Sequence, residues 1–374
     1  MDNAEHRELA RDMARKSIVL LKNAEHLLPL DVGGSERIAV VGPLARAESE
    51  MVGPWRVVWK EPPPPPSVTL WAALSALLPP EKLSFAEGCS IDGKQDDEAQ
   101  WEADAKAIAE AVQVASEADV VVFAVGESSV MSGESACRDS LRLPGAQERL
   151  VQALAATGKR VIAVVFAGRP LVMPSLVKHS HAVLYAWWLG TEAGHALTDV
   201  LFGAHSPSGR LPVSFPASEG QIPTHYSFKN TGVPYRTFAY LDVPAEPAFA
   251  FGFGLTYTTF EYSGLQLDRS MLELGTDGEC VQVSFTLRNT GAREGVEVTQ
   301  LYVRDVVSSL TRPLMELKGF ERVELQPGAS RRISFSLDQR ALAFYIGDGP
   351  DVDSGNNTRI QEACVLIGQY SHSV

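Results

Sequence analysis

The chain has 374 residues, a formal net charge of −13 at pH 7 and an apolar fraction of 45%. This length predicts about two or three domains, and the apolar fraction is sufficient for packed cores. The negative charge makes nucleic acid and anionic membranes poor partners, and we expect neither. No stretch of about 18 apolar residues is present, so we expect no membrane-spanning segment.

Helix and strand patterns alternate in the N-terminal part of the chain. An amphipathic helix is predicted over residues 4–21, where apolar residues recur at helical spacing: Leu9 with Met13, Ala10 with Ala14, and Ile18 with Leu21. Strands are then predicted near 37–41, 83–86, 120–125, 160–166 and 181–186, and further helices near 69–78, 98–117, 145–156 and 191–202. Strands that alternate with helices predict an α/β fold with a mostly parallel sheet and helices on both faces, an α/β sandwich.

Proline and glycine mark two irregular regions. Residues 62–66 are five consecutive prolines, which predict an exposed polyproline segment because proline fits neither a helix interior nor a central strand. Residues 217–262 are rich in aromatic residues, glycine and proline, and we expect them to form ordered coil that wraps the α/β body.

The hydrophobic pattern changes to a period of two after Phe260. Apolar and polar residues alternate over 281–287 and again over 333–337, with a turn signal at 326–328. Short alternating strands of this kind predict an all-β sandwich. The predicted domains are residues 1–216 for the α/β sandwich, 217–262 for a wrapping linker and 263–374 for the β-sandwich.

The four cysteines, at positions 89, 137, 280 and 364, lie far apart, with no Cys-x-x-Cys pair and no histidine set nearby. This spacing does not favour a zinc site, and free, buried thiols are the simpler interpretation. We expect no metal and no other cofactor.

A long polar loop follows the apolar strand at 120–125, which ends at Gly126. In open α/β sheets, ligands bind beyond the carboxyl ends of the strands. The loop has about 17 residues, well above the usual 2–6, and long ordered loops are more often functional. It carries Glu127, Glu134 and Arg138, and we take it as the candidate site.

Several segments, in the same order, resemble the C-terminal half of glycoside hydrolase family 3, the β-glucosidase and β-xylosidase family. These segments are residues 14–23, 38–43, 190–216, 221–223, 251–260 and 312–320. The resemblance covers nearly the whole chain and is closest to bacterial β-glucosidases with a fibronectin type III-like domain at the C-terminus. It implies that residues 1–216 form the α/β sandwich domain of that family and residues 263–374 the fibronectin type III-like domain.

The resemblance also implies a β/α barrel before this region, carrying the aspartate nucleophile and most of the sugar-binding residues. No such segment is present in the chain, so we expect a gene fragment, a split subunit or a stand-alone relative that lost the barrel. As it stands the chain has no signal peptide and is expected to be cytoplasmic, whereas a full-length enzyme could be periplasmic with its export signal on the other half.

By resemblance, Glu134 is the acid/base of the reaction, because Ser132-Gly-Glu134 followed by Cys137-Arg138 matches the family's motif. Retaining glycosidases pair such a carboxyl with a nucleophile about 5–5.5 Å away. Without a barrel the loop is expected to be solvated and mobile. The alternative is that Glu134 is a surface carboxylate paired with Arg138, an interaction that contributes at most about 1 kcal/mol.

Other residues near the loop carry less specific signals. Glu127 is expected to hold the loop by hydrogen bonds, Arg138 to orient it, and Asp139 is a weaker candidate for the acid. Trp187 and Trp188 could form a sugar platform, although large core aromatics are an equally good interpretation.

Two functions therefore compete. The first is a β-glucosidase-like half that supplies the acid/base loop for hydrolysis of terminal β-D-glucosides, with a β-glucoside or oligosaccharide substrate and a separate barrel-bearing chain as partner. The second is a non-catalytic carbohydrate-binding or interaction module that lost the barrel. Residues 347–357 depart from the family's pattern, which gives weight to a third possibility, a degraded remnant.

Overall fold

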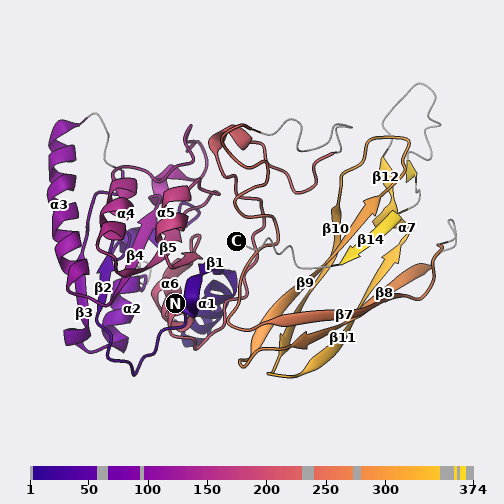
Figure 1. Cartoon of the computed structure of the whole chain (residues 1–374), viewed down its shortest axis with the longest axis horizontal. Helices are drawn as coiled ribbons and strands as arrows, with labels where there is room; N and C mark the ends of the chain where they lie inside the picture. The colour runs from indigo at the N-terminus through magenta and orange to yellow at the C-terminus, as the bar shows by residue number, and fades with distance from the viewer. Residues whose placement is uncertain are drawn as a thin grey trace.

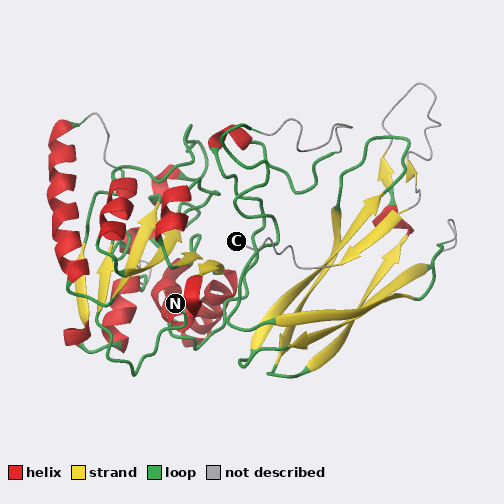
Figure 2. Cartoon of the chain, in the orientation of Figure 1, coloured by secondary structure: helices red, strands yellow, loops and turns green. Residues whose placement is uncertain are grey.

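A computed structural model of the chain describes residues 3–56, 66–92, 97–229, 240–272 and 279–345, and the backbone of two short strands at 358–359 and 363–367. An α/β body and a β-domain stand side by side, with coil between them (Figures 1 and 2). The predicted polyproline segment, apart from Pro66, and the unusual stretch at 347–357 lie outside the described residues.

The α/β body is built on a six-stranded sheet with the strand order β1-β6-β5-β4-β2-β3. Its strands are β1 (Val19–Asn23), β2 (Ile38–Val41), β3 (Leu83–Ala86), β4 (Val120–Gly126), β5 (Arg160–Phe166) and β6 (Ala182–Tyr185). All neighbouring pairs are parallel except β1 with β6. The prediction of a mostly parallel sheet is confirmed.

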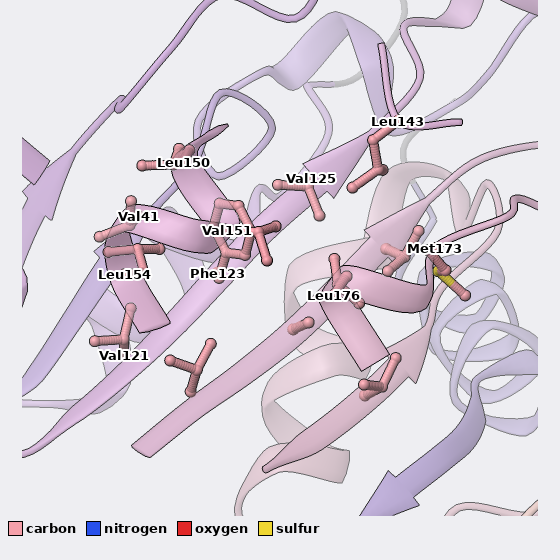
Figure 3. Close-up of a cluster of buried hydrophobic side chains, with 14 of the residues drawn as sticks. Val41, Val121, Phe123, Val125, Leu143, Leu150, Val151, Leu154, Met173 and Leu176 are labelled. Carbon is pink, nitrogen blue, oxygen red and sulfur yellow. The ribbon is translucent and has the colours of Figure 1, made fainter. Parts of the chain in front are cut away.

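Helices cover both faces of this sheet (Figure 1). They are α1 (Ala4–Ser17), α2 (Leu70–Leu77), α3 (Glu98–Ser116), α4 (Gln147–Ala156), α5 (Pro174–His179) and α6 (Ala193–Leu201). Phe123 of β4 packs with Leu150 and Leu176 in the core under α3, α4 and α5 (Figure 3). Val122, the residue before it, belongs to the opposite core under α1, α2 and α6. The central strand is therefore buried on both sides, as its continuous apolar run predicts.

The predicted helix over residues 4–21 is too long. Helix α1 ends at Ser17, and Val19 begins the antiparallel edge strand β1. The reason is burial on two sides: Val19 and Leu21 enter one core, and Leu20 enters the other. Strand geometry sends successive side chains to opposite faces, which a helix cannot do.

Helix α1 docks through ion pairs, and its large apolar side chains stay exposed. Leu9 and Met13 are 58% and 62% exposed. Arg7 pairs with the buried Glu192 at 2.6 Å, and Arg11 pairs with Asp199 through two bonds of 2.5 and 2.7 Å. Bidentate arginine–carboxylate contacts fix geometry more strongly than single contacts do, so these bonds set the position of α1 on α6.

The β-domain consists of antiparallel strands arranged in two main sheets, ordered β10-β9-β14 and β11-β8-β7. Its elements are β7 (Phe260–Leu267), β8 (Cys280–Asn289), β9 (Gly295–Asp305), β10 (Glu316–Leu325), β11 (Ser330–Asp338), α7 (Gln339–Leu342), β12 (Phe344–Tyr345), β13 (Thr358–Arg359) and β14 (Ala363–Ile367). Val283 of one sheet packs with Leu301 and Val303 of the other. The predicted all-β sandwich is confirmed.

The coil between the two cores adheres to the α/β body. Phe215 and Phe249 form a two-residue β-bridge, and both belong to the core under α5. Leu255 donates its backbone N–H to Leu20 of β1 at 2.8 Å. The domain limits predicted from the sequence stay a prediction; in the structure, the packing changes from one core to the other at the start of β7, Phe260.

A buried ion pair joins this coil to the β-domain. Arg210 lies 2.8 Å from Glu297 of β9, and their side chains are 6% and 0% exposed. Tyr262 donates its hydroxyl to the other carboxylate oxygen at 2.9 Å. Burial and the adjacent Glu297 carboxylate raise the pKa of the Tyr262 phenol, so the hydroxyl keeps its proton and remains a donor.

The described cysteines do not all fit one interpretation. Cys89 is buried, and burial raises the pKa of its thiol to about 12. Cys280 is half-buried and Cys137 is exposed. The prediction of buried thiols is therefore wrong for Cys137, because its loop projects from the sheet edge into solvent.

We predict that Glu297→Ala destabilises the protein strongly, because it leaves the Arg210 guanidinium buried and unpaired. Loss of one partner of a buried ion pair lowers the free energy of unfolding by about 3–5 kcal/mol. The matched control is Glu321→Ala, whose partner Arg331 is 53% exposed; an exposed pair contributes about 0–1 kcal/mol. Urea denaturation followed by fluorescence measures both, and equal losses would contradict the interpretation of the buried pair.

Candidate functional site

The candidate loop begins where β4 ends, and the end of that strand is fixed by glycine geometry. Gly126 has φ +137, and a Cβ at this position would lie 1.7 Å from the carbonyl oxygen of Phe166 on β5. The Gln147 side chain, at the start of α4, receives the Gly126 N–H and donates to its carbonyl, both at 2.8 Å. The chain therefore leaves the sheet at a defined point.

Glu127, the first residue of the loop, is fully buried. Arg138 Nη1 lies 2.7 Å from one carboxylate oxygen, and Arg169 Nε lies 3.0 and 3.1 Å from the two oxygens. The Ser132 hydroxyl donates to the same carboxylate at 3.2 Å. A buried carboxylate has to be paired and hydrogen-bonded, and Glu127 meets both conditions. These contacts fit the predicted role of holding the loop, which stays a prediction.

Glu134 lies at the exposed tip of the loop. The two residues beside it, Gly133 and Ser135, have positive φ values of 113° and 60°, so the chain turns sharply around it. Within the described residues Glu134 forms no ion pair, and Arg138 is engaged elsewhere, with Glu127 and with the Arg142 carbonyl at 3.1 Å. The alternative of a Glu134–Arg138 surface pair is therefore wrong in this structure.

The loop is attached to neighbouring segments on both sides of Glu134, and we call the part before Glu134 the first limb and the part after it the second limb. On the first limb, the backbone N–H of Ser129 donates to Glu50. On the second, Ser140 Oγ and the Leu141 N–H donate to Glu219 at 2.7 and 2.5 Å, and these bonds hold the pKa of Glu219 below its ordinary value. Solvent thus reaches the tip, while the base of the loop and the segments on both sides of the tip are bonded to the body; the expected mobility of the loop stays a prediction.

An exposed tryptophan beside the loop was missed by the sequence analysis. Trp55 is 76% exposed, and its neighbour Pro54 packs against Gly133, where an added Cβ would come within 2.9 Å of Pro54 Cβ. Exposure of so large an apolar side chain, one residue from the Pro54 that contacts Gly133, marks a place where a partner surface can pack. The signal in the sequence was the Gly-Pro-Trp run at 53–55, which precedes the prolines.

Trp187 and Trp188 are half-buried behind the loop. Trp187 packs edge-to-face on Tyr185 and Phe215, with ring centroids 4.7 and 6.0 Å apart, so the core interpretation describes it. The Trp188 ring lies against Gly53, and its Nε1 atom is buried without a hydrogen-bond partner among the described residues.

Two cavities of the described chain, of about 820 and 640 Å³, lie beside α5 and between α1 and the β-domain, and no residue of the loop lines either of them. Among the described residues no group of three or more His, Cys, Asp or Glu side chains could hold a metal ion. No described helix is long and apolar enough to cross a membrane. Glu134 and Asp139 are both exposed to solvent.

Comparison with known proteins identifies the family. The profile of the glycosyl hydrolase family 3 C-terminal domain matches residues 18–257, more than half of the chain, and that of a fibronectin type III-like domain matches 297–356. A periplasmic β-glucosidase of Salmonella typhimurium is 42% identical over 91% of this chain and 46% of its own length. A β-xylosidase of Formosa agariphila is 38% identical over 89% of this chain and 45% of its own.

Solved structures agree with this result. A β-glucosidase from Listeria innocua, in complex with glucose, superposes with a TM-score of 0.85 and 33% identity, over 99% of this chain and 48% of that one. The chain spans about half the length of the curated relatives it matches. It therefore belongs to glycosyl hydrolase family 3, of which it carries the C-terminal domain followed by a fibronectin type III-like domain.

Proposed function

We propose that this chain is the half of a β-glucosidase-type glycoside hydrolase that supplies the acid/base loop for hydrolysis of terminal β-D-glucosides. The nucleophile would come from a barrel domain that completes the site. The observation that carries the proposal is the placement of Glu134. Its carboxylate has no ion-pair partner among the described residues and lies at the exposed tip of a loop whose base is bonded to the sheet, in a chain that spans about half of the β-glucosidases it matches.

In this mechanism Glu134 acts twice. It first donates a proton to the glycosidic oxygen while the nucleophile attacks the sugar, and the leaving alcohol departs. The Glu134 carboxylate then removes a proton from the water that hydrolyses the covalent glycosyl–enzyme intermediate, which restores the acid. The first step needs a protonated carboxyl near neutral pH. Covering the exposed tip with a second domain would supply the burial that raises a carboxyl pKa.

The surroundings of the tip support a substrate site on this side of the sheet. The ends of β4 and β5 meet there in parallel register, at the edge where ligands of open α/β sheets bind. Trp55, which follows the Pro54 that contacts Gly133, offers an exposed apolar face on which a sugar ring or the leaving group could pack. The matched relatives include β-glucosidases, a β-xylosidase and a putative β-xylosidase, so the β-glucoside class rests on the greater number of β-glucosidases among them.

The competing function is a non-catalytic carbohydrate-binding or interaction module. The exposed Trp55 would serve such a module equally well, because stacking on a sugar needs no acid. The two functions differ in what Glu134 does: a binding module tolerates its amide, whereas an enzyme loses both of its proton transfers.

We predict that the purified chain alone does not hydrolyse aryl β-glucosides, because an acid/base without a nucleophile lacks the covalent route. The assay is release of nitrophenol by the wild-type chain and by a Glu134→Gln control prepared in parallel. Release that is present in the wild type and lost in the control would show that this chain holds a complete site.

We predict a characteristic pattern for Glu134→Gln in a completed enzyme, made by joining this chain to the part of the Salmonella typhimurium β-glucosidase that it does not match. Turnover of substrates with poor leaving groups should fall by about 10²–10⁴, the usual contribution of general acid–base catalysis. Activated aryl glucosides should be less affected in the first step, because their leaving groups need little protonation.

Added azide should rescue the activated substrate and form glucosyl azide, because azide attacks the intermediate without a base. Glu127→Gln and Asp139→Asn are the matched controls within the same loop. Azide rescue in either of them, and not in Glu134→Gln, would move the acid/base assignment to that residue.

A further inference from the structure

We propose that Arg169 is the positioning residue that fixes the turn carrying Glu134, through a bridge from the end of β4 to the two residues before Gly133. The inference rests on the proposed function of Glu134. Arg169 lies outside the loop, just beyond the end of β5, and its side chain is 20% exposed.

The guanidinium of Arg169 has two sets of partners. Its Nε atom bonds the buried Glu127 carboxylate, as described above, and its Nη2 atom donates to the Met131 carbonyl oxygen and lies 3.4 Å from Ser132 Oγ. A guanidinium is planar and holds its donors in a fixed fork. One rigid group therefore sets the distance between the strand end and the backbone that leads directly into Gly133 and Glu134.

The backbone of Arg169 is itself bonded to the core of the sheet. Tyr185, a fully buried residue of β6, donates its hydroxyl to the Arg169 carbonyl. The preceding Gly168 allows the loop to approach, since a Cβ there would lie 3.0 Å from Ser132 Oγ and 2.8 Å from Trp188 Nε1. The turn is thus tied to the core of the sheet through Arg169, in addition to the contacts within the loop.

Arg138 and Arg169 both contact the Glu127 carboxylate, so either arginine can be replaced while the other still pairs with Glu127. With Arg169 removed, Glu127 keeps its 2.7 Å contact with Arg138, so no buried carboxylate is left without a cation. An Arg169→Gln variant should therefore fold while losing the bridge to Met131 and Ser132. Arg169→Lys keeps the positive charge but lacks the fork, so it separates positioning from simple charge balance.

The first test is hydrogen–deuterium exchange on the chain itself. The reporters are the amides of Met131 and Ala136, which bond the Ser128 and Gly133 carbonyls at 3.0 and 3.2 Å. We expect both Arg169→Gln and Arg169→Lys to lose protection at these amides. The control is Arg160→Gln, at the opposite end of β5 from Arg169. Arg160 pairs with Glu36, and its side chain is 43% exposed. Unchanged protection in both Arg169 variants would overturn the proposal.

The second test is kinetic and uses the completed enzyme described above. A displacement of about 1 Å can lower turnover about 10²-fold. We expect kcat for a poor leaving group to fall by about that factor in both Arg169 variants, with KM little changed. A rise in KM at unchanged kcat, or recovery by lysine, would overturn the positioning role. If azide fails to rescue Glu134→Gln, the proposed function of Glu134 is wrong. The hydrogen–deuterium exchange result tests the role of Arg169 independently of that outcome.

Discussion

The buried carboxylate of Glu127, shared by two arginines, is the interaction on which the candidate site depends. Arg138 comes from the far limb of the loop and Arg169 from the end of the next strand, and both lie within about 3 Å of the same group. Because a buried charge without partners is strongly destabilising, these contacts tie the strand end, the loop and β5 into one unit. Glu134 projects from that unit into solvent.

A second buried ion pair connects segments that lie further apart in the sequence. Arg210 and Glu297 connect the coil after α6 to the β-domain, and the same coil places Phe215 against Tyr185 at 4.8 Å between ring centroids. Tyr185 in turn holds the carbonyl of Arg169. The coil after α6 thus contacts both the β-domain, through Arg210, and Tyr185, which bonds the backbone at the base of the candidate site.

The fold could be predicted because its signals are periodic. Alternating helix and strand patterns gave the α/β sandwich, and period-two strands gave the β-sandwich. The helix predicted over 4–21 was wrong after Ser17, because the buried edge strand β1 has the same apolar composition as the end of a helix. The pairing of Val19 with Tyr185 makes this segment a strand. Tertiary pairing of this kind leaves no local signal.

The contacts around the candidate loop could be predicted only in part. The loop, Glu127, Glu134 and Arg138 were found because they are contiguous in sequence after one strand. Arg169 was missed because it is distant in sequence from the loop. It follows β5, the parallel neighbour of β4, and the ends of these two strands lie at the same edge of the sheet, which could have indicated it. The pairing of Arg138 with Glu127 and not with Glu134 depends on burial, which spacing does not show.

The dependence of kcat/KM on pH in the completed enzyme tests the central claim most directly. An acid that must be protonated for the first step gives a basic limb, along which activity falls as pH rises through its pKa. If Glu134 is that acid, the basic limb disappears in Glu134→Gln, while the acidic limb set by the nucleophile remains. A basic limb that persists unchanged in Glu134→Gln would contradict the assignment of Glu134 as the acid/base.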